Sequence, residues 1–311
     1  MAEPQRRATG RALVPVAVLA LVWGLNWPIL KLGVTELPPL TFRGYTLAVA
    51  GLGLLAIARA SGESIRVPRA LWPLVVLLAL FNITGWNGLV LFGVQQMPAG
   101  RSAILAYTMP VWATLVSLMV LHEPIGRRKA LGLLLGMAGM LLLLGEDLAT
   151  IERRPFAALM ILGAAFIWAC GTVLLRKHKP PLPQNTLTGW MMIVGWAPLA
   201  AVAPLLDPDW AARIPSLNAT AWFAILYNIV LAGTIAHWAW FTIARTLPVA
   251  VSSLSSLPVP VVGVFAGMLV LGERPGWPEW AALALVVAAL VAVMWPAGNK
   301  PPSTAPASPE D

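Results

Sequence analysis

The chain has 311 residues, of which 59% are hydrophobic and 11% are charged, and its formal net charge at pH 7 is +8. Soluble domains carry about 25% charged residues, so this composition excludes an ordinary soluble domain and indicates a membrane protein. The basic residues lie in short loops between apolar segments, which argues against a nucleic-acid partner. A single cysteine, Cys170, excludes a disulfide bond within the chain.

Ten runs without a charged residue follow one another along the chain. They cover residues 12–30, 44–58, 70–100, 102–122, 130–145, 155–175, 180–206, 214–244, 246–272 and 280–299. A helix that spans a bilayer needs about 20 mostly apolar residues, and eight runs meet that length. The second and fifth runs are shorter and would reach the interfaces through flanking Arg and Lys side chains. Barrel strands alternate at every second residue, and these runs do not. We therefore predict an all-α membrane protein with ten transmembrane helices.

The expected helices can be placed in chain order. After a basic lead at residues 1–11, they cover about 13–31, 40–58, 72–95, 99–121, 129–145, 156–176, 185–205, 219–243, 249–271 and 279–296. A polar loop divides them into two units of five helices, residues 12–146 and residues 156–296. Residues 297–311 are rich in Pro and Ser, a composition typical of disorder.

Part of the sequence occurs twice. Residues 97–126 read MPAGRSAILAYTMPVWATLVSLMVLHEPIG, and residues 247–276 read LPVAVSSLSSLPVPVVGVFAGMLVLGERPG. The pairs that align at an offset of 150 include Pro98 and Pro248, Ser102 and Ser252, Pro110 and Pro260, and Glu123 and Glu273. A weaker echo at an offset of 145 pairs Trp23 with Trp168. This self-similarity predicts a duplicated unit of roughly 150 residues.

Five helices is an odd number, so the second unit would enter the membrane from the opposite side. Such inverted repeats are typical of secondary transporters, whose substrate site lies near the middle of the membrane between the repeats. With the N-terminus placed inside, the inner segments hold 14 Lys and Arg residues and the outer segments hold 6. This bias predicts that both termini are cytoplasmic.

Polar side chains inside a bilayer are costly and usually face a cavity or the protein interior. We predict that a substrate-binding set lies on these helices: Trp23, Asn26, Asn82, Asn87, Tyr107, Trp168, His237 and Ser252. A packing role for His237 and for half of the serines near Ser252 is an equal alternative. Asn228 and His237 are nine residues apart, which places them roughly opposite on an ideal helix, so both could face one cavity only through a bend or a difference in depth.

The sequence also suggests how transport is driven and which residues act as hinges. None of the 13 acidic residues lies in the middle of an expected helix, which favours passage down a solute gradient or coupling through His237. Pro110 and Pro260 are candidate hinges, with fixed kinks as the alternative. Gly132 and Gly136 form a GxxxG pair that suits either packing within the chain or a homodimer seam. Glu123 and Glu273, at the ends of their helices, are expected to have structural roles such as capping.

Other classes of protein find little support. The sequence has no P-loop, no HExxH and no GxSxG motif, so it predicts neither an enzyme nor a bound cofactor or metal. A scaffold or receptor without transport activity would not explain the duplication. The expected partners are a small-molecule substrate and the lipid bilayer.

The ten-helix duplication resembles the drug/metabolite transporter superfamily with two EamA-type repeats, over roughly residues 13–296. The motifs are WGLNW at residues 23–27, Arg43 early in the second helix, and the spaced Pro, Pro and Glu of the repeated segment. The interior, rich in Trp and free of carboxylates, is similar to the aromatic amino acid exporter branch often called YddG-type. The resemblance implies a central cavity lined by helices 1–4 and 6–9, and efflux of amino acids or metabolites across a bacterial inner membrane. A proton-coupled multidrug, metabolite or nucleotide-sugar carrier of the same superfamily is the alternative.

Overall fold

The computed structural model describes residues 3–122, 126–149, 155–240 and 258–294, and every regular element in these ranges is helical. In chain order the elements are α1 (Glu3–Glu36), α2 (Pro39–Ala60), the 3₁₀ helix η1 (Arg69–Leu71), α3 (Trp72–Ala79), the π-helix η2 (Leu80–Gly85), α4 (Trp86–Gln96), α5 (Ala99–Ala106), α6 (Met109–Leu121), α7 (Arg127–Ala149), α8 (Pro155–His178), α9 (Gln184–Leu206), the 3₁₀ helix η3 (Ile214–Ser216), α10 (Ala219–Leu226), the π-helix η4 (Tyr227–Ile235), α13 (Pro258–Leu271) and α14 (Trp277–Met294). The expected all-α class is confirmed.

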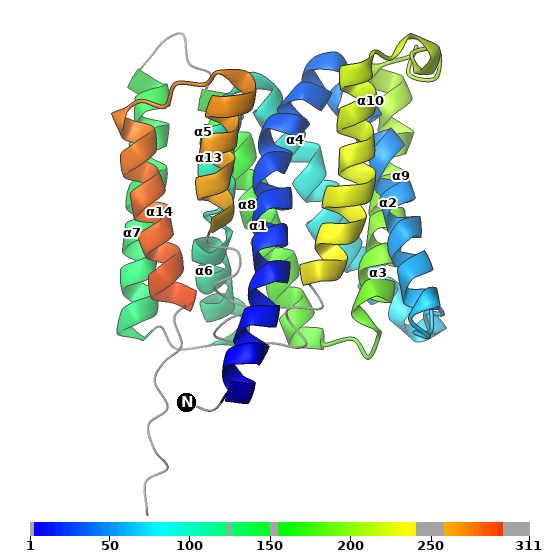
Figure 1. Ribbon diagram of the computed structural model, residues 1–311, viewed down its shortest axis with the longest axis horizontal. Coiled ribbons are helices and arrows are strands. Elements are labelled where there is room, and N and C mark those ends of the chain that lie inside the picture. The colour runs from blue at the N-terminus through cyan, green and yellow to red at the C-terminus, as the bar shows by residue number, and fades with distance from the viewer. Residues whose placement is uncertain (1–2, 123–125, 150–154, 241–257, 295–311) are drawn as a thin grey trace, which may run out of the picture.

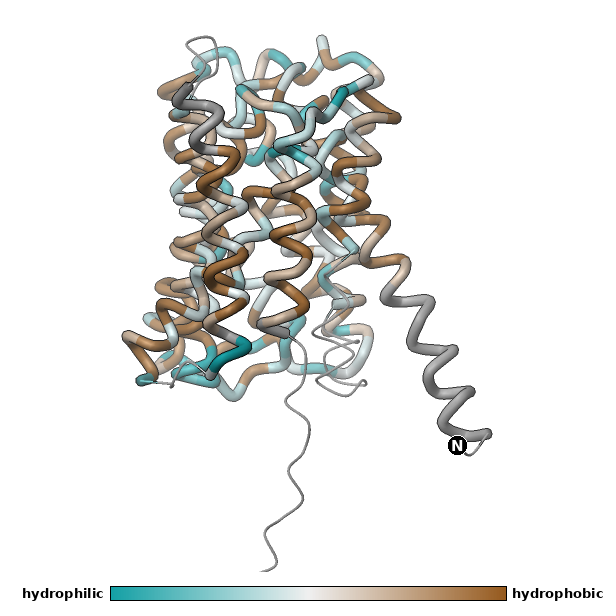
Figure 2. Tube along the Cα trace, turned by 90° about the vertical axis from the view of Figure 1, so that its left-hand side faces the viewer, coloured by the Kyte–Doolittle hydropathy of each residue, from teal (hydrophilic) through white to brown (hydrophobic). Residues whose placement is uncertain are grey.

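Within the described ranges, seven helical segments are long and apolar enough to cross a membrane, and three further apolar helices are shorter. The three shorter segments are Ala130–Leu143, Pro258–Leu271 and Trp277–Ala292. The helices run side by side in one bundle, with the start of α1 and the end of α14 at the same end of it (Figure 1). Apolar residues follow the flanks of the bundle, and hydrophilic residues gather toward its two ends (Figure 2). The protein is therefore a multi-pass helical membrane protein.

Several helices begin at a proline. Pro38 precedes α2, Pro98 precedes α5 and Pro183 precedes α9, each with an extended backbone before the first turn. A proline is well tolerated at a helix start, because the N–H group that it lacks would have no partner there. The helix α10 instead starts with an asparagine cap, since Asn218 Oδ1 accepts from the Ala221 N–H at 2.8 Å.

The neighbours of each helix define the bundle. The elements that pack against each other include α2 with α9, α7 with α14, α1 with α13, α6 with α8, α4 with α8, and α2 with η4. The pair formed by α7 and α14 lies at one edge of the bundle (Figure 1). These pairings put α1, α2, α8 and η4 around the middle of the bundle.

The two glycines of the GxxxG motif face the interior of the protein. Gly132 and Gly136 are both buried, and a methyl group added at Gly136 would lie 2.2 Å from Val111 Cγ2 on α6. Gly136 therefore allows α7 to pack closely against α6, in line with the packing alternative, and the homodimer seam stays a prediction.

Two boundaries differ from the expected ones. The helix α1 starts at Glu3, well before residue 13, because the residues of the basic lead continue the same helix. The helix expected over residues 99–121 is divided into α5 and α6, and Tyr107 and Thr108 form a turn between them. Residues 297–311, the expected disordered tail, lie outside the described ranges.

Candidate functional site

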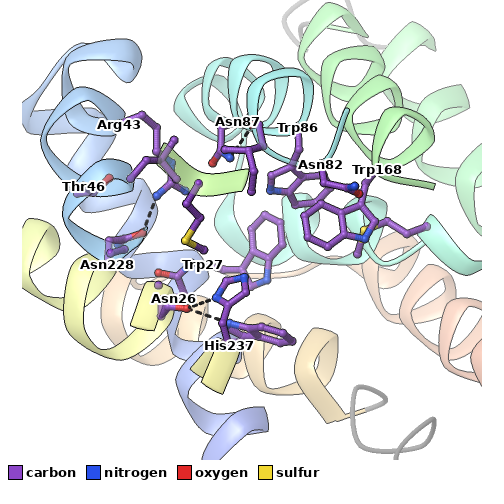
Figure 3. Close-up of a pocket in the computed structure, with 18 of the residues that line it drawn as sticks. Asn26, Trp27, Arg43, Thr46, Asn82, Trp86, Asn87, Trp168, Asn228 and His237 are labelled. Carbon is purple, nitrogen blue, oxygen red and sulfur yellow. Dashed lines mark hydrogen bonds between the residues drawn. The ribbon is translucent and has the colours of Figure 1, made fainter. Parts of the chain in front are cut away.

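A cavity of about 160 Å³ lies in the middle of the bundle (Figure 3). Its lining residues are Trp23, Asn26, Trp27, Arg43, Thr46, Leu47, Ala50, Asn82, Ile83, Trp86, Asn87, Tyr107, Met109, Trp168, Met192, Asn228, Ala232, Gly233 and His237. They come from the first four expected helices and from the sixth, seventh and eighth. None of the described residues of α7 or α14 is among them.

The cavity brings together seven of the eight residues expected to bind substrate. Trp23, Asn26, Asn82, Asn87, Tyr107, Trp168 and His237 all line it. The eighth, Ser252, lies outside the described ranges. The geometry thus places the expected residues around one space, and their binding of a substrate remains a prediction.

Tryptophan rings form much of the cavity wall. Trp86 and Trp168 meet edge to face, with 5.3 Å between their ring centroids, and Trp23 meets His237 in the same way at 5.4 Å. Trp27 lies between Trp168 and His237 in the view of Figure 3. Aromatic rings packed in this way have few accessible rotamers, so they offer a preformed apolar surface to a ligand.

Three asparagines of the cavity wall are each held by a hydrogen bond from the side chain to a carbonyl of the same helix. The Nδ2 group of Asn82 donates to Leu78 O at 3.2 Å, that of Asn87 to Ile83 O at 2.8 Å, and that of Asn228 to Ala224 O at 3.1 Å. Each acceptor is the carbonyl four residues earlier in the same helix. One of the two N–H groups of each amide is therefore used within the helix, and the Oδ1 atoms can accept from other groups, as that of Asn228 accepts from Arg43.

Two π-helical stretches explain how polar residues that an α-helix would separate reach the same cavity. An α-helix turns about 100° per residue, so nine residues would carry Asn228 and His237 to opposite faces. In η4 the turns are wider, because the hydrogen bonds join residues five apart and each residue turns the chain through a smaller angle. The helix between Asn228 and His237 therefore departs from the ideal α-helical geometry, and both residues line the cavity.

A spacing of five residues also separates Asn82 in η2 from Asn87 at the start of α4, and both line the cavity. In and just after η4, His237 Nδ1 lies 3.0 Å from the carbonyl of Ala232, and Thr234 Oγ1 donates to the carbonyl of Ile229 at 2.8 Å. Each of these contacts also spans five residues. Short π-helical stretches within α-helices occur frequently at functional sites.

Arg43 is a cavity residue that the sequence-based set missed. Its side chain is 8% exposed, its Nη1 group donates to Asn228 Oδ1 at 3.0 Å, and its Nε atom has no partner. A charged residue inside an apolar segment is by itself a signal of a functional site. That signal was present in the sequence, but the charge could not be assigned to a face of the helix without the packing of α2 against η4.

Near the end of the bundle at Glu36, two charged side chains bind backbone groups of neighbouring helices. Lys31 Nζ donates to the carbonyls of Val94 and Gln95 in the last turn of α4, at 2.8 and 2.7 Å, and to that of Met97 just after it, at 3.0 Å. The carboxylate of Glu273 accepts from the N–H groups of Ala99 and Gly100, the first residues of α5, at 2.5 and 2.9 Å. The capping role expected for Glu273 is confirmed, whereas Glu123 lies outside the described ranges.

The two candidate hinges are placed differently. Pro110 is the second residue of α6, directly after the turn at Tyr107 and Thr108, so the chain bends beside the cavity. Pro260 is the third residue of α13, and the chain before Pro258 lies outside the described ranges. The missing N–H of Pro110 explains the turn, because a helical bond from that position to the carbonyl of Ala106 cannot form.

The fold and the cavity define a class, a multi-pass helical membrane protein with a polar and aromatic site enclosed by its helices. The model of the EamA-like transporter family matches residues 11–145 and 155–295. These two matches cover most of the chain, and the chain belongs to this family. Membership indicates a transporter rather than an enzyme.

Proteins with similar sequences carry names of the same kind. An uncharacterized transporter, YoaV of Bacillus subtilis, is 24% identical over 267 residues, which cover 85% of this chain and 90% of that protein. The uncharacterized inner membrane transporter YedA of Escherichia coli K12 is 27% identical, with 91% and 92% covered. A probable amino-acid metabolite efflux pump of Salmonella typhimurium is 25% identical, with 88% and 91% covered.

A solved structure described as a crystal structure of protein shares the fold. It matches with a TM-score of 0.64 and 20% sequence identity, and the match covers 91% of this chain and 97% of that one. At this identity the similarity extends to the fold alone.

Proposed function

We propose that this protein is a secondary transporter that exports small organic solutes, with aromatic and neutral amino acids as the first class of substrate. The observation that carries the proposal is the cavity in the middle of the bundle, walled by four tryptophans and lined by four asparagines. Rings bind the apolar part of a solute, and amides fix its polar part. The printed name of the Salmonella typhimurium relative, an amino-acid metabolite efflux pump, supports this class.

We further propose that the ten helices form two inverted repeats of five. At the offset of 150 residues, η2 falls on residues 230–235, within η4, and Asn87 falls on His237. The pairings of helices also exchange between the halves, since α1 packs on α13 while α8 packs on α6. In such a pair of repeats, exchanging the conformations of the two halves produces the opposite-facing state, which supports alternating access through the cavity.

The start of α1 and the end of α14 lie at the same end of the bundle, and we propose that this end is cytoplasmic in a bacterial inner membrane. The 14 to 6 bias of basic residues supports this orientation. A reporter enzyme that works only in the periplasm, fused after Lys300, is expected to be silent, and the same reporter inserted after Trp210 is expected to be active. Activity of the Lys300 fusion would overturn the proposed orientation.

We expect transport without proton coupling, because no carboxylate is among the described residues that line the cavity. In liposomes that contain the pure protein, efflux of labelled phenylalanine should persist when the pH is equal on both sides. It should stop only when the phenylalanine gradient has collapsed. Acidification or alkalinisation of the lumen that is driven by phenylalanine would contradict this expectation.

The second candidate is a proton-coupled exporter of drugs or metabolites in the same family. It rests on His237, whose imidazole lines the cavity and belongs to a side-chain type that can take up and release a proton. His237 aligns with Asn87 of the first half at the offset of 150 residues. The variant His237→Asn therefore gives both halves the same residue at this position. Wild-type flux in this variant at equal pH would favour the uncoupled carrier, and loss of any pH-driven flux would favour the proton-coupled one.

A further inference from the structure

We propose that Arg43 is the anchor for a carboxylate group, and that the cavity selects aromatic solutes that carry this negative charge. This inference rests on the proposed function, in which the cavity is the substrate site. It narrows the substrate to aromatic carboxylates, for which a free amino group is tolerated but not required.

Arg43 carries a buried charge that has no acidic partner among the described residues. Its side chain is 8% exposed, and its one hydrogen-bond partner among the described residues is the neutral Oδ1 of Asn228, at 3.0 Å. The ion pairs Arg101–Glu279 and Arg213–Asp207 lie elsewhere in the described chain, and neither includes Arg43. An arginine side chain stays protonated in proteins, and an unpaired buried charge is costly. The missing counter-charge is what a bound anion would supply.

The guanidinium group has hydrogen-bonding capacity that the described residues do not use. Nη1 is occupied by Asn228, whereas Nε is buried without a partner. Arginine binds carboxylates through two parallel N–H groups, and such paired, charge-assisted bonds are stronger and more directional than neutral ones. The side chain of Asn228 is itself held by a hydrogen bond to the carbonyl of Ala224, so Asn228 restrains the position of the Arg43 guanidinium group.

The aromatic wall lies across the cavity from this charge. In Figure 3, Arg43 and Asn228 lie on one side of the cavity, and Trp86 and Trp168 lie on the other. A solute with a carboxylate at one end and an aromatic ring at the other would contact both groups at once.

A cation finds no matching partner in the same space. The described lining residues include no Asp and no Glu, so an ammonium group would meet only neutral acceptors. One of these is Asn26 Oδ1, which is buried without a partner and could accept from an amino group or a hydroxyl group. The positive charge of Arg43 acts against cationic drugs throughout this low-dielectric site.

Four solutes with the same phenyl group test the proposal: 3-phenylpropanoate, L-phenylalanine, 3-phenylpropanamide and 3-phenylpropylamine. Binding to the purified full-length protein is measured by quenching of tryptophan fluorescence, and flux is measured in liposomes. We expect the two carboxylates to bind at least about tenfold more tightly than the neutral amide, as a charge-assisted hydrogen bond allows. The amine should not compete with them.

Variants of Arg43 test whether the preference for carboxylates over the amide depends on this residue. Arg43→Gln should remove the preference for the acid while the amide still binds, and Arg43→Lys should keep part of the preference. The matched control is Arg59→Gln, which changes an exposed arginine of the same helix and should leave the preference unchanged. A purely structural role for Arg43 would weaken the binding of the acid and of the amide alike.

The wild-type comparison keeps the test decisive even if an Arg43 variant does not fold. Equal binding of acid and amide by the wild-type protein would overturn the role of Arg43 and leave the proposed transport function intact. Competition by chloride as strong as that by 3-phenylpropanoate would replace the aromatic carboxylate with a small inorganic anion, and would also overturn the proposal. If none of the four solutes binds or moves, the proposed function fails for aromatic solutes, and this inference fails with it.

Discussion

Replacing Glu273 with alanine is expected to reduce the free energy of unfolding by about 3 kcal/mol and to open the adjacent end of the bundle. Its carboxylate accepts from the N–H groups of Ala99 and Gly100, so two charge-assisted hydrogen bonds would be lost. These N–H groups start α5 and have no partner within the helix. The negative charge also lies at the positive end of the helix dipole, which adds to the stabilisation.

Thermal unfolding in detergent and the accessibility of an introduced cysteine measure the two effects. The variant Glu273→Gln keeps one acceptor and should lose less stability than Glu273→Ala. Glu36→Ala is the matched control, because Glu36 lies near the same end of the bundle and accepts a single bond from Asn218. An unfolding temperature for Glu273→Ala equal to that of the wild type would show that this cap does not stabilise the fold.

Replacing Pro110 with alanine is expected to slow transport by about tenfold, which corresponds to a shift of about 1.4 kcal/mol between two states. Alanine restores the N–H group that can bond to the carbonyl of Ala106, so α5 and α6 would tend to join into one helix. The turn that would straighten contains Tyr107, which lines the cavity. Pro260→Ala should slow transport too, and should shift cysteine accessibility toward the opposite side of the membrane.

Flux in liposomes and labelling from each side provide the measurement. The control is Pro73→Ala. Pro73 is exposed in the first turn of α3, where N–H groups have no partner within the helix, so this proline costs no helical hydrogen bond. Transport at the wild-type rate and unchanged labelling in both hinge variants would mean that these prolines are fixed kinks.

Much of the helical framework follows from the sequence, because apolar runs near 20 residues and prolines at helix starts are local signals. The runs preceded by Pro38, Pro98 and Pro183 begin in the structure within a few residues of their expected starts. Trp23 and Asn26 were also accessible to this reasoning, since they lie three residues apart on one helix face.

Other features depend on contacts between helices. The sequence does not reveal the π-helical geometry of η2 and η4, so the shared face of Asn228 and His237 could not be predicted from an ideal spacing. The charge of Arg43 was visible, but its place beside Asn228 depends on how α2 packs against η4. Trp27 and Trp86 also join the site only because the helices that carry them surround the same space.

One contact within the eighth expected helix fixes the tautomer of a cavity residue. The carbonyl of Ala232 can only accept, and it lies 3.0 Å from Nδ1 of His237, so neutral His237 carries its proton on Nδ1. Its Nε2 atom then keeps a lone pair. Together with the Oδ1 atoms of Asn82 and Asn87, this nitrogen adds to the hydrogen-bond acceptors of the residues that line the cavity. A solute bound there gains most if it supplies hydrogen-bond donors, such as the N–H of an indole ring or of an amino group.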